Sequence, residues 1–141
     1  MKTSESRYHQ CLYFTSNAFA RKVEKLALHY WKPLGFSPSH GYLLMVVLQE
    51  PGVQPTKLAN ELQLTPSTIT RLIEKLEGQA LITRMLDGKT TMVYATDKAK
   101  ALLPEMQAAM DGFYMAYSKI LGPEASCALT QQIATVADAL P

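Results

Sequence analysis

The fold is decided by one stretch of the sequence, KLANELQLTPSTITRLIEKLEGQALITR, at residues 57–84. Its start belongs to a predicted helix over residues 55–62, which opens at Pro55 and turns its leucines inward. A tight turn through residues 63–65 follows. Thr65 and Pro66 then supply the N-cap and first-turn proline of a second helix over residues 66–79. Two short helices joined by a tight turn predict a helix-turn-helix.

The second helix of this unit has one apolar and one polar face. The apolar stripe, at helical spacing, consists of Ile69, Leu72, Ile73 and Leu76. The opposite face carries Ser67, Thr68, Thr70, Arg71 and Lys75. Small polar side chains allow a helix to approach base edges in the major groove, and arginine makes a forked contact to guanine. Free backbone N–H groups near Thr65 suit a phosphate oxygen, so this face is predicted to bind DNA.

A β-hairpin is predicted directly after the second helix. The β-prone runs at residues 81–85 and 91–95 flank Asp87-Gly88, a dipeptide typical of tight hairpin turns. A hairpin after a helix-turn-helix forms a wing. Arg84 and Lys89 lie on it, and both are predicted to reach a neighbouring DNA backbone or minor groove.

Long helices are expected on both sides of this centre. The apolar spacing predicts helices over residues 6–31, 38–50, 97–121 and 123–140, with a bend at Pro104 in the third. The fold class is therefore mainly α with one small hairpin.

Composition limits the class of protein. The chain has 141 residues, of which 48% are hydrophobic and 18% charged, which suits one domain with a real core. So low a charged fraction suggests that some surface is covered by a partner, commonly a second copy. No secretory signal follows the N-terminus, and the longest apolar run is far below the ~20 residues of a membrane helix. We expect a cytoplasmic protein without membrane contact.

The net charge of +2 is unevenly distributed. Residues 1–55 carry +3 and residues 56–100 carry +2, whereas residues 101–141 carry −3. The first two thirds of the chain are thus basic and the last third is acidic.

The central stretch resembles the MarR family of transcriptional regulators. The resemblance rests on residues 57–84, on Asp87-Gly88-Lys89, and on ATDKAKALLPEM at residues 95–106. It implies a winged helix-turn-helix at residues 33–100, flanked by helical dimerisation regions at residues 1–32 and 101–141. It also implies a homodimer that places two recognition helices in successive major grooves. Family wings carry Asp-x-Arg at the tip where this chain has Lys89, which lacks the fork of arginine.

The function expected from these features is a homodimeric repressor of a pseudo-palindromic operator. A small apolar or aromatic ligand, or thiol oxidation, would relieve the repression. The alternative is a winged-helix module for protein interaction, in which the Ser and Thr residues are ordinary caps and the cations form a solvated face. No nucleophile–base pair, phosphate loop or paired carboxylates stand out, so neither enzymatic activity nor a cofactor is expected.

Candidate sensing residues fall into two groups. Cys11 is predicted on the apolar stripe of the first helix and Cys127 in the last helix; both are redox candidates, and the alternative is that both are small buried hydrophobes. The resemblance places an effector cleft between the dimer helices and the winged region. Its predicted lining is Trp31, Phe36, His40 and Met106. The histidines do not pair at i, i+4, and no metal site is expected.

Overall fold

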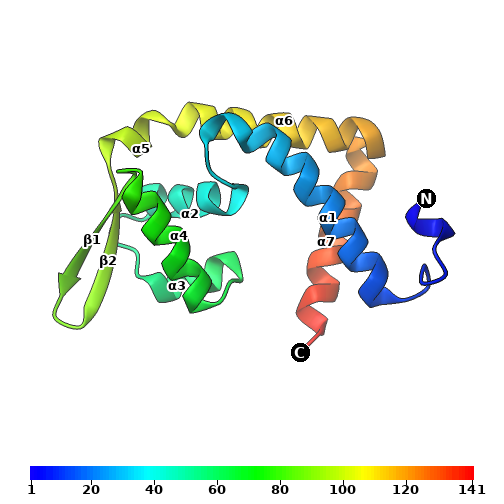
Figure 1. Ribbon diagram of the computed structural model, residues 1–141, viewed down its shortest axis with the longest axis horizontal. Helices are drawn as coiled ribbons and strands as arrows, with labels where there is room; N and C mark the ends of the chain where they lie inside the picture. The colour runs from blue at the N-terminus through cyan, green and yellow to red at the C-terminus, as the bar shows by residue number, and fades with distance from the viewer.

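The computed structural model describes all residues, 1–141, and is helical apart from one hairpin (Figure 1). Two short 3₁₀ turns occupy Thr3–Glu5 and Lys32–Leu34. The elements in chain order are α1 (Leu12–Trp31), α2 (Pro38–Gln49), α3 (Pro55–Leu62), α4 (Pro66–Gly78), β1 (Ile82–Asp87), β2 (Thr90–Ala95), α5 (Asp97–Ala101), α6 (Leu103–Leu121) and α7 (Pro123–Ala139). The predicted class, a winged helix-turn-helix with long flanking helices, is confirmed.

The core lies under the winged region. It is a cluster of 18 buried residues, drawn mainly from α2, α3, α4 and the hairpin. The predicted stripe of α4 is entirely buried, with Ile69 and Leu76 fully inaccessible. Trp31 from the end of α1 and Met106 from α6 belong to the same cluster, so the long helices are anchored to the winged region through shared core residues.

The hairpin is antiparallel, and Asp87 pairs with Thr90 at its tip. The two turn residues are therefore Gly88 and Lys89, one position later than the predicted Asp87-Gly88. Gly88 has a φ of 63°, and a positive φ at the first central residue is what the two-residue turns of tight hairpins require. A β-bridge between Val53 and Val93 ties the base of the hairpin to the segment before α3.

The first helix starts later than predicted. The spacing predicted a helix from residue 6, but α1 begins at Leu12. Ser6 explains the difference, because its hydroxyl accepts from the Tyr8 backbone N–H and its carbonyl oxygen lies 2.8 Å from His9 Nδ1. Such local bonds compete with helix formation. Cys11 is consequently the residue before α1 and is exposed, so its predicted place on an apolar stripe within the helix is wrong.

The helix predicted over residues 97–121 is divided into two. Leu102 separates α5 from α6, and its N–H bonds back to Ala99 in a tighter turn. Pro104 lies in the first turn of α6, where its missing N–H costs no helical bond. The proline thus marks a new helix start, whereas a bend within one helix was predicted.

The long helices form the end of the molecule away from the hairpin. In Figure 1, α6 runs from the wing side to the opposite end, where α1 and α7 lie. Twelve of the eighteen exposed large hydrophobic side chains are on α1, α6 and α7. This end of the protomer therefore presents far more apolar surface than the winged region does. None of the helices combines the length and apolarity needed to cross a bilayer.

Candidate nucleic-acid interface

The N-terminus of α4 is built around Thr65. This N-cap residue has an extended backbone, and its Oγ1 accepts from the Thr68 backbone N–H at 3.4 Å. The same Oγ1 lies 3.3 Å from Ser67 Oγ and 3.0 Å from Thr68 Oγ1. Capping in this way satisfies one of the free donors at a helix start. The predicted residues Thr65, Ser67 and Thr68 are thus brought together as one surface cluster of hydroxyl groups.

The exposed face of α4 continues this cluster with cations. Arg71 is exposed one turn further on, and its Nη2 lies 3.4 Å from Thr68 Oγ1. Lys75 follows another turn along, also exposed. Thr70 is exposed, but its hydroxyl donates to the Pro66 carbonyl at 3.0 Å. Hydroxyls followed by cations lie on the side of α4 opposite its buried stripe, as the sequence predicted.

The turn before α4 holds the two helices in a tight unit. Gln63 ends α3 in the left-handed conformation, with a φ of 55°, which is uncommon for a residue other than glycine. Its side-chain Nε2 donates to the Asn60 carbonyl at 2.7 Å, and the Leu64 N–H bonds to the Ala59 carbonyl. These bonds satisfy two of the four carbonyls that the end of a helix leaves free, those of Ala59 and Asn60.

The two predicted wing cations differ in their surroundings. Lys89 occupies the exposed hairpin tip, and no hydrogen bond or ion pair holds its side chain. Arg84, on β1, makes two hydrogen bonds to Glu77 in the last turn of α4, at 3.0 and 2.7 Å. Glu77 was not identified from the sequence, because nothing in its spacing to Arg84 shows that the chain reverses between them.

The four predicted effector residues are brought together, but inside the core. Trp31 and Met106 are inaccessible, and Phe36 and His40 are buried. The ring of Phe36 lies 6.3 Å from that of Trp31 and 6.4 Å from that of His40. Ser37 Oγ lies 2.6 Å from His40 Nδ1, and burial, with Lys75 nearby, lowers the pKa of His40. Their role at an effector site remains a prediction.

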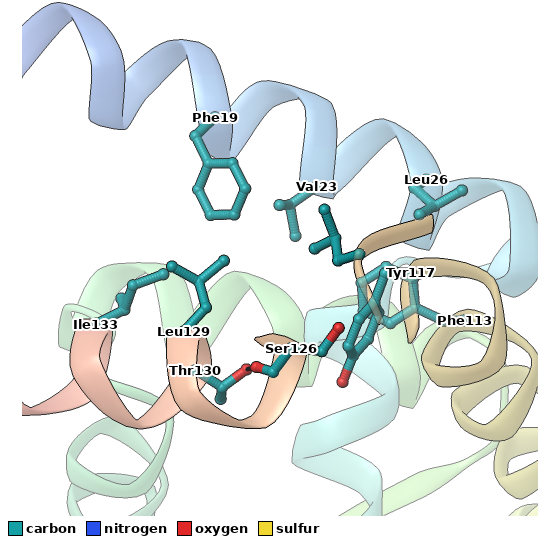
Figure 2. Close-up of a pocket in the computed structure, with 10 residues that line it drawn as sticks. Phe19, Val23, Leu26, Phe113, Tyr117, Ser126, Leu129, Thr130 and Ile133 are labelled. Carbon is teal, nitrogen blue, oxygen red and sulfur yellow. Dashed lines mark hydrogen bonds between the residues drawn. The ribbon is translucent and has the colours of Figure 1, made fainter. Parts of the chain in front are cut away.

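An apolar groove lies elsewhere, between α1, α6 and α7. It has a volume of about 280 Å³, and Figure 2 shows its walls. The lining consists of Phe19, Val23, Leu26, Phe113, Tyr117, Leu121, Ser126, Leu129, Thr130 and Ile133. Most of these side chains belong to helical stripes in the sequence. Their spacing did not indicate that α1 and α7 leave a gap between them.

The two cysteines are exposed in the protomer and form no disulfide. Cys11 precedes α1, and Cys127 lies on α7. The alternative interpretation of both as buried hydrophobes is therefore wrong for the isolated protomer. No group of three or more His, Cys, Asp or Glu side chains is placed to hold a metal ion.

The fold and this surface define a class of protein, the winged helix-turn-helix proteins with a helical extension. The model of the MarR family matches residues 34–89, which span α2, α3, α4, β1 and the turn of the hairpin. Over this winged helix, the chain is therefore similar to the MarR family. Comparison with curated proteins gives no match.

Solved structures share the fold over nearly the whole chain. The transcriptional repressor CouR bound to a 23-mer DNA duplex has a TM-score of 0.84 and 22% identity, covering 97% of this chain and 98% of that one. The PcaV regulator from Streptomyces coelicolor, in complex with its natural ligand, has a TM-score of 0.83 and 16% identity, covering 95% and 96%. The MepR–DNA complex from S. aureus has a TM-score of 0.79 and 17% identity, covering 92% and 98%. The fold thus agrees well beyond the region that the family model matches.

Proposed function

We propose that the protein is a sequence-specific DNA-binding regulator of transcription, acting as a homodimeric repressor. One observation carries the proposal. On α4, the exposed Ser67, Arg71 and Lys75 form a polar face opposite a buried stripe, in a fold that CouR and MepR adopt in their complexes with DNA. The proposal involves no catalysis. A protein with this function would act on chromosomal DNA in the cytoplasm.

The chemistry of α4 suits entry into the major groove. The N-terminus of α4, with its cluster of hydroxyl groups around Thr65, would enter the groove first. The short side chains there allow the helix to approach the base edges. Arg71 comes next, and its guanidinium is held only by a long contact to Thr68, so it is free to form a forked contact to guanine. Lys75, Ser67 and Thr70 would bind the sugar–phosphate backbone and fix the register.

The wing extends this contact to one side of α4. Lys89 stands at the tip of the hairpin without a partner in the protein. There it would bind a phosphate or enter the minor groove, as a point charge without base specificity.

Dimerisation is assigned to the long helices, residues 1–32 and 101–141, with residues 33–100 as the DNA-binding part. The exposed apolar side chains on α1, α6 and α7, and the groove between them, are surface that a second copy would cover. A twofold axis through these helices would present two copies of α4. They would read half-sites about 34–36 Å apart, one turn of the duplex.

Relief of repression is assigned to a small apolar molecule. CouR has been solved with p-coumaroyl-CoA and PcaV with its natural ligand, which supports a ligand-responsive fold. The effector candidates Trp31, Phe36, His40 and Met106 lie where α1 and α6 meet the winged region. A ligand that separates these elements would change the spacing of the two α4 helices, provided that it binds the two states unequally. Oxidation of the exposed Cys11 or Cys127 is the second route.

The experiment that tests the function is selection from a random-sequence duplex library, followed by sequencing. The expected result is enrichment of one pseudo-palindromic motif. The Arg71→Ala variant is expected to enrich a motif with one position relaxed in each half-site. Recovery of unenriched sequence by the wild-type protein would contradict the proposal and favour a protein-interaction module.

A further inference from the structure

One ion pair joins the wing to the recognition helix. Arg84 Nε donates to Glu77 Oε2 at 3.0 Å, and its Nη2 donates to Glu77 Oε1 at 2.7 Å. Two nitrogens of the guanidinium therefore bind the two oxygens of one carboxylate. This bidentate geometry fixes the relative orientation of the two side chains as well as their separation. Both side chains are only about one-third exposed.

The position of Arg84 on β1 turns it toward α4. Successive side chains of a strand point to opposite faces, so Arg84 shares a face with Ile82, which is buried in the core. Its cross-strand partner is Val93, which is inaccessible. The guanidinium thus lies on the inner side of the hairpin, where the hairpin meets the helix.

The chain between α4 and β1 is fixed by a second set of contacts. Ala80 has a φ of 59°, and its carbonyl accepts from Thr96 Oγ1 at 2.7 Å. The carbonyl of Gln79 accepts from Lys98 Nζ at 2.8 Å. These bonds hold the base of the hairpin. The pair between Arg84 and Glu77 is the next contact outward, and no side-chain hydrogen bond beyond it connects the hairpin to α4.

The pair of Arg84 and Glu77 also neutralises one carboxylate on the surface of α4 that is proposed to lie next to DNA. Glu74 and Glu77 are both on α4, close to Lys75, and only Glu77 has a cationic partner. The hydrogen bonds that Arg84 donates to Glu77 raise the pKa of the guanidinium, which therefore remains charged. Two of the five N–H donors of the guanidinium are already engaged, and its charge is balanced by the carboxylate, so it is a weaker partner for a phosphate than a free arginine.

We propose that Arg84 is a positioning residue. It acts through Glu77 to set the angle of the wing against α4 and thereby places Lys89 on the DNA backbone, without contacting DNA itself. This inference rests on the proposed function and replaces the direct DNA contact that the sequence predicted for Arg84.

The test is a set of glutamine variants, assayed by fluorescence anisotropy on the duplex that the selection enriches. Arg84→Gln is expected to weaken binding by roughly two- to fivefold, since partly exposed pairs contribute little more. Glu77→Gln is expected to weaken it equally, and the double variant no further. The diagnostic variant is Glu77→Gln, because removing a carboxylate near phosphates would by itself strengthen binding.

Two controls separate this effect from simple electrostatics and from misfolding. Glu74→Gln removes an unpaired carboxylate from the same helix and is expected to leave binding unchanged or tighter. In a Lys89→Ala background, Arg84→Gln and Glu77→Gln are expected to have less than a twofold effect, because the contact they position is already gone. Thermal unfolding by circular dichroism checks that all variants fold.

The inference is overturned if Glu77→Gln leaves binding unchanged or tighter while Arg84→Gln weakens it, which would make Arg84 a direct phosphate contact. It is also overturned if neither variant weakens binding. Failure of the wild-type protein to enrich any duplex would instead contradict the proposed function on which the inference rests.

Discussion

The indole ring of Trp31 occupies the space that a side chain on Gly41 would need. A Cβ built on Gly41 would overlap the ring carbons of Trp31. Trp31 is the last residue of α1, and Gly41 lies in the first turns of α2. The contact therefore joins the end of α1 to α2, at the edge of the winged region.

Gly41→Ala is expected to destabilise the protein by about 1–3 kcal/mol, the usual cost of overpacking a filled core. Chemical denaturation followed by tryptophan fluorescence measures it. Gly78→Ala is the matched control, since open space surrounds that helical glycine, and it is expected to be neutral or stabilising by up to about 1 kcal/mol. Equal free energies of unfolding for the two variants would contradict the packing described.

Protonation of His40 is expected to lower the free energy of unfolding at acidic pH. Burial, then the charge of Lys75, lowers the pKa of its imidazole in the folded protein. The unfolded chain therefore binds the proton first as the pH falls through about 6.5, and the free energy of unfolding decreases from there toward the lower folded pKa. Urea titrations between about pH 7.5 and about pH 5 should show a smaller decrease for His40→Gln than for wild type. Parallel pH profiles for the two proteins would show that His40 does not contribute.

Ile133→Asp is expected to disrupt the dimer. Ile133 is 46% exposed in the protomer and lines the groove between α1, α6 and α7. An unpaired carboxylate buried there by a second copy would lose its hydration without compensation. Sedimentation velocity should show a shift from dimer to monomer. Gln131→Asp, with the same charge on the opposite side of α7, is expected to remain dimeric; dissociation of both variants would argue against the assigned surface.

Arg71→Ala is expected to weaken binding to the enriched duplex by on the order of 1–3 kcal/mol and to relax base preference at one position of each half-site. Both effects follow from loss of a forked contact to guanine. Arg21→Ala removes an exposed arginine from α1 and serves as the control. An unchanged affinity of the Arg71→Ala variant for the duplex would contradict the assignment of α4 as the recognition helix.

Lys89→Ala is expected to act differently from Arg71→Ala. It should weaken binding to all duplex sequences alike and lower the slope of log affinity against log salt by about one, because one phosphate contact is lost. Lys22→Ala on α1 is the matched control. A change in base preference for Lys89→Ala would mean that the wing reads sequence.

The parts of this structure that could be predicted from sequence are those fixed by local signals. The stripe and N-cap of α4 lie within one helix, so periodicity and Thr65-Pro66 placed both correctly. Hydrogen bonds that Ser6 accepts moved the start of α1, and the spacing of apolar residues does not indicate them. The pairing of Arg84 with Glu77 depends on how the chain reverses at Ala80, and the groove depends on how α1 and α7 diverge. Such features arise from tertiary packing and leave no periodic pattern.

The central claim is that a dimer presents two copies of α4 to two half-sites. The most direct measurement compares affinities, by fluorescence anisotropy, for the enriched duplex and for two altered forms. One form has a single half-site shuffled, and the other has five base pairs inserted between the half-sites. Two protomers are expected on the intact duplex, with affinity falling at least tenfold on either alteration, since half-sites must lie about one helical turn apart on one face. Equal affinity for all three duplexes would contradict the account.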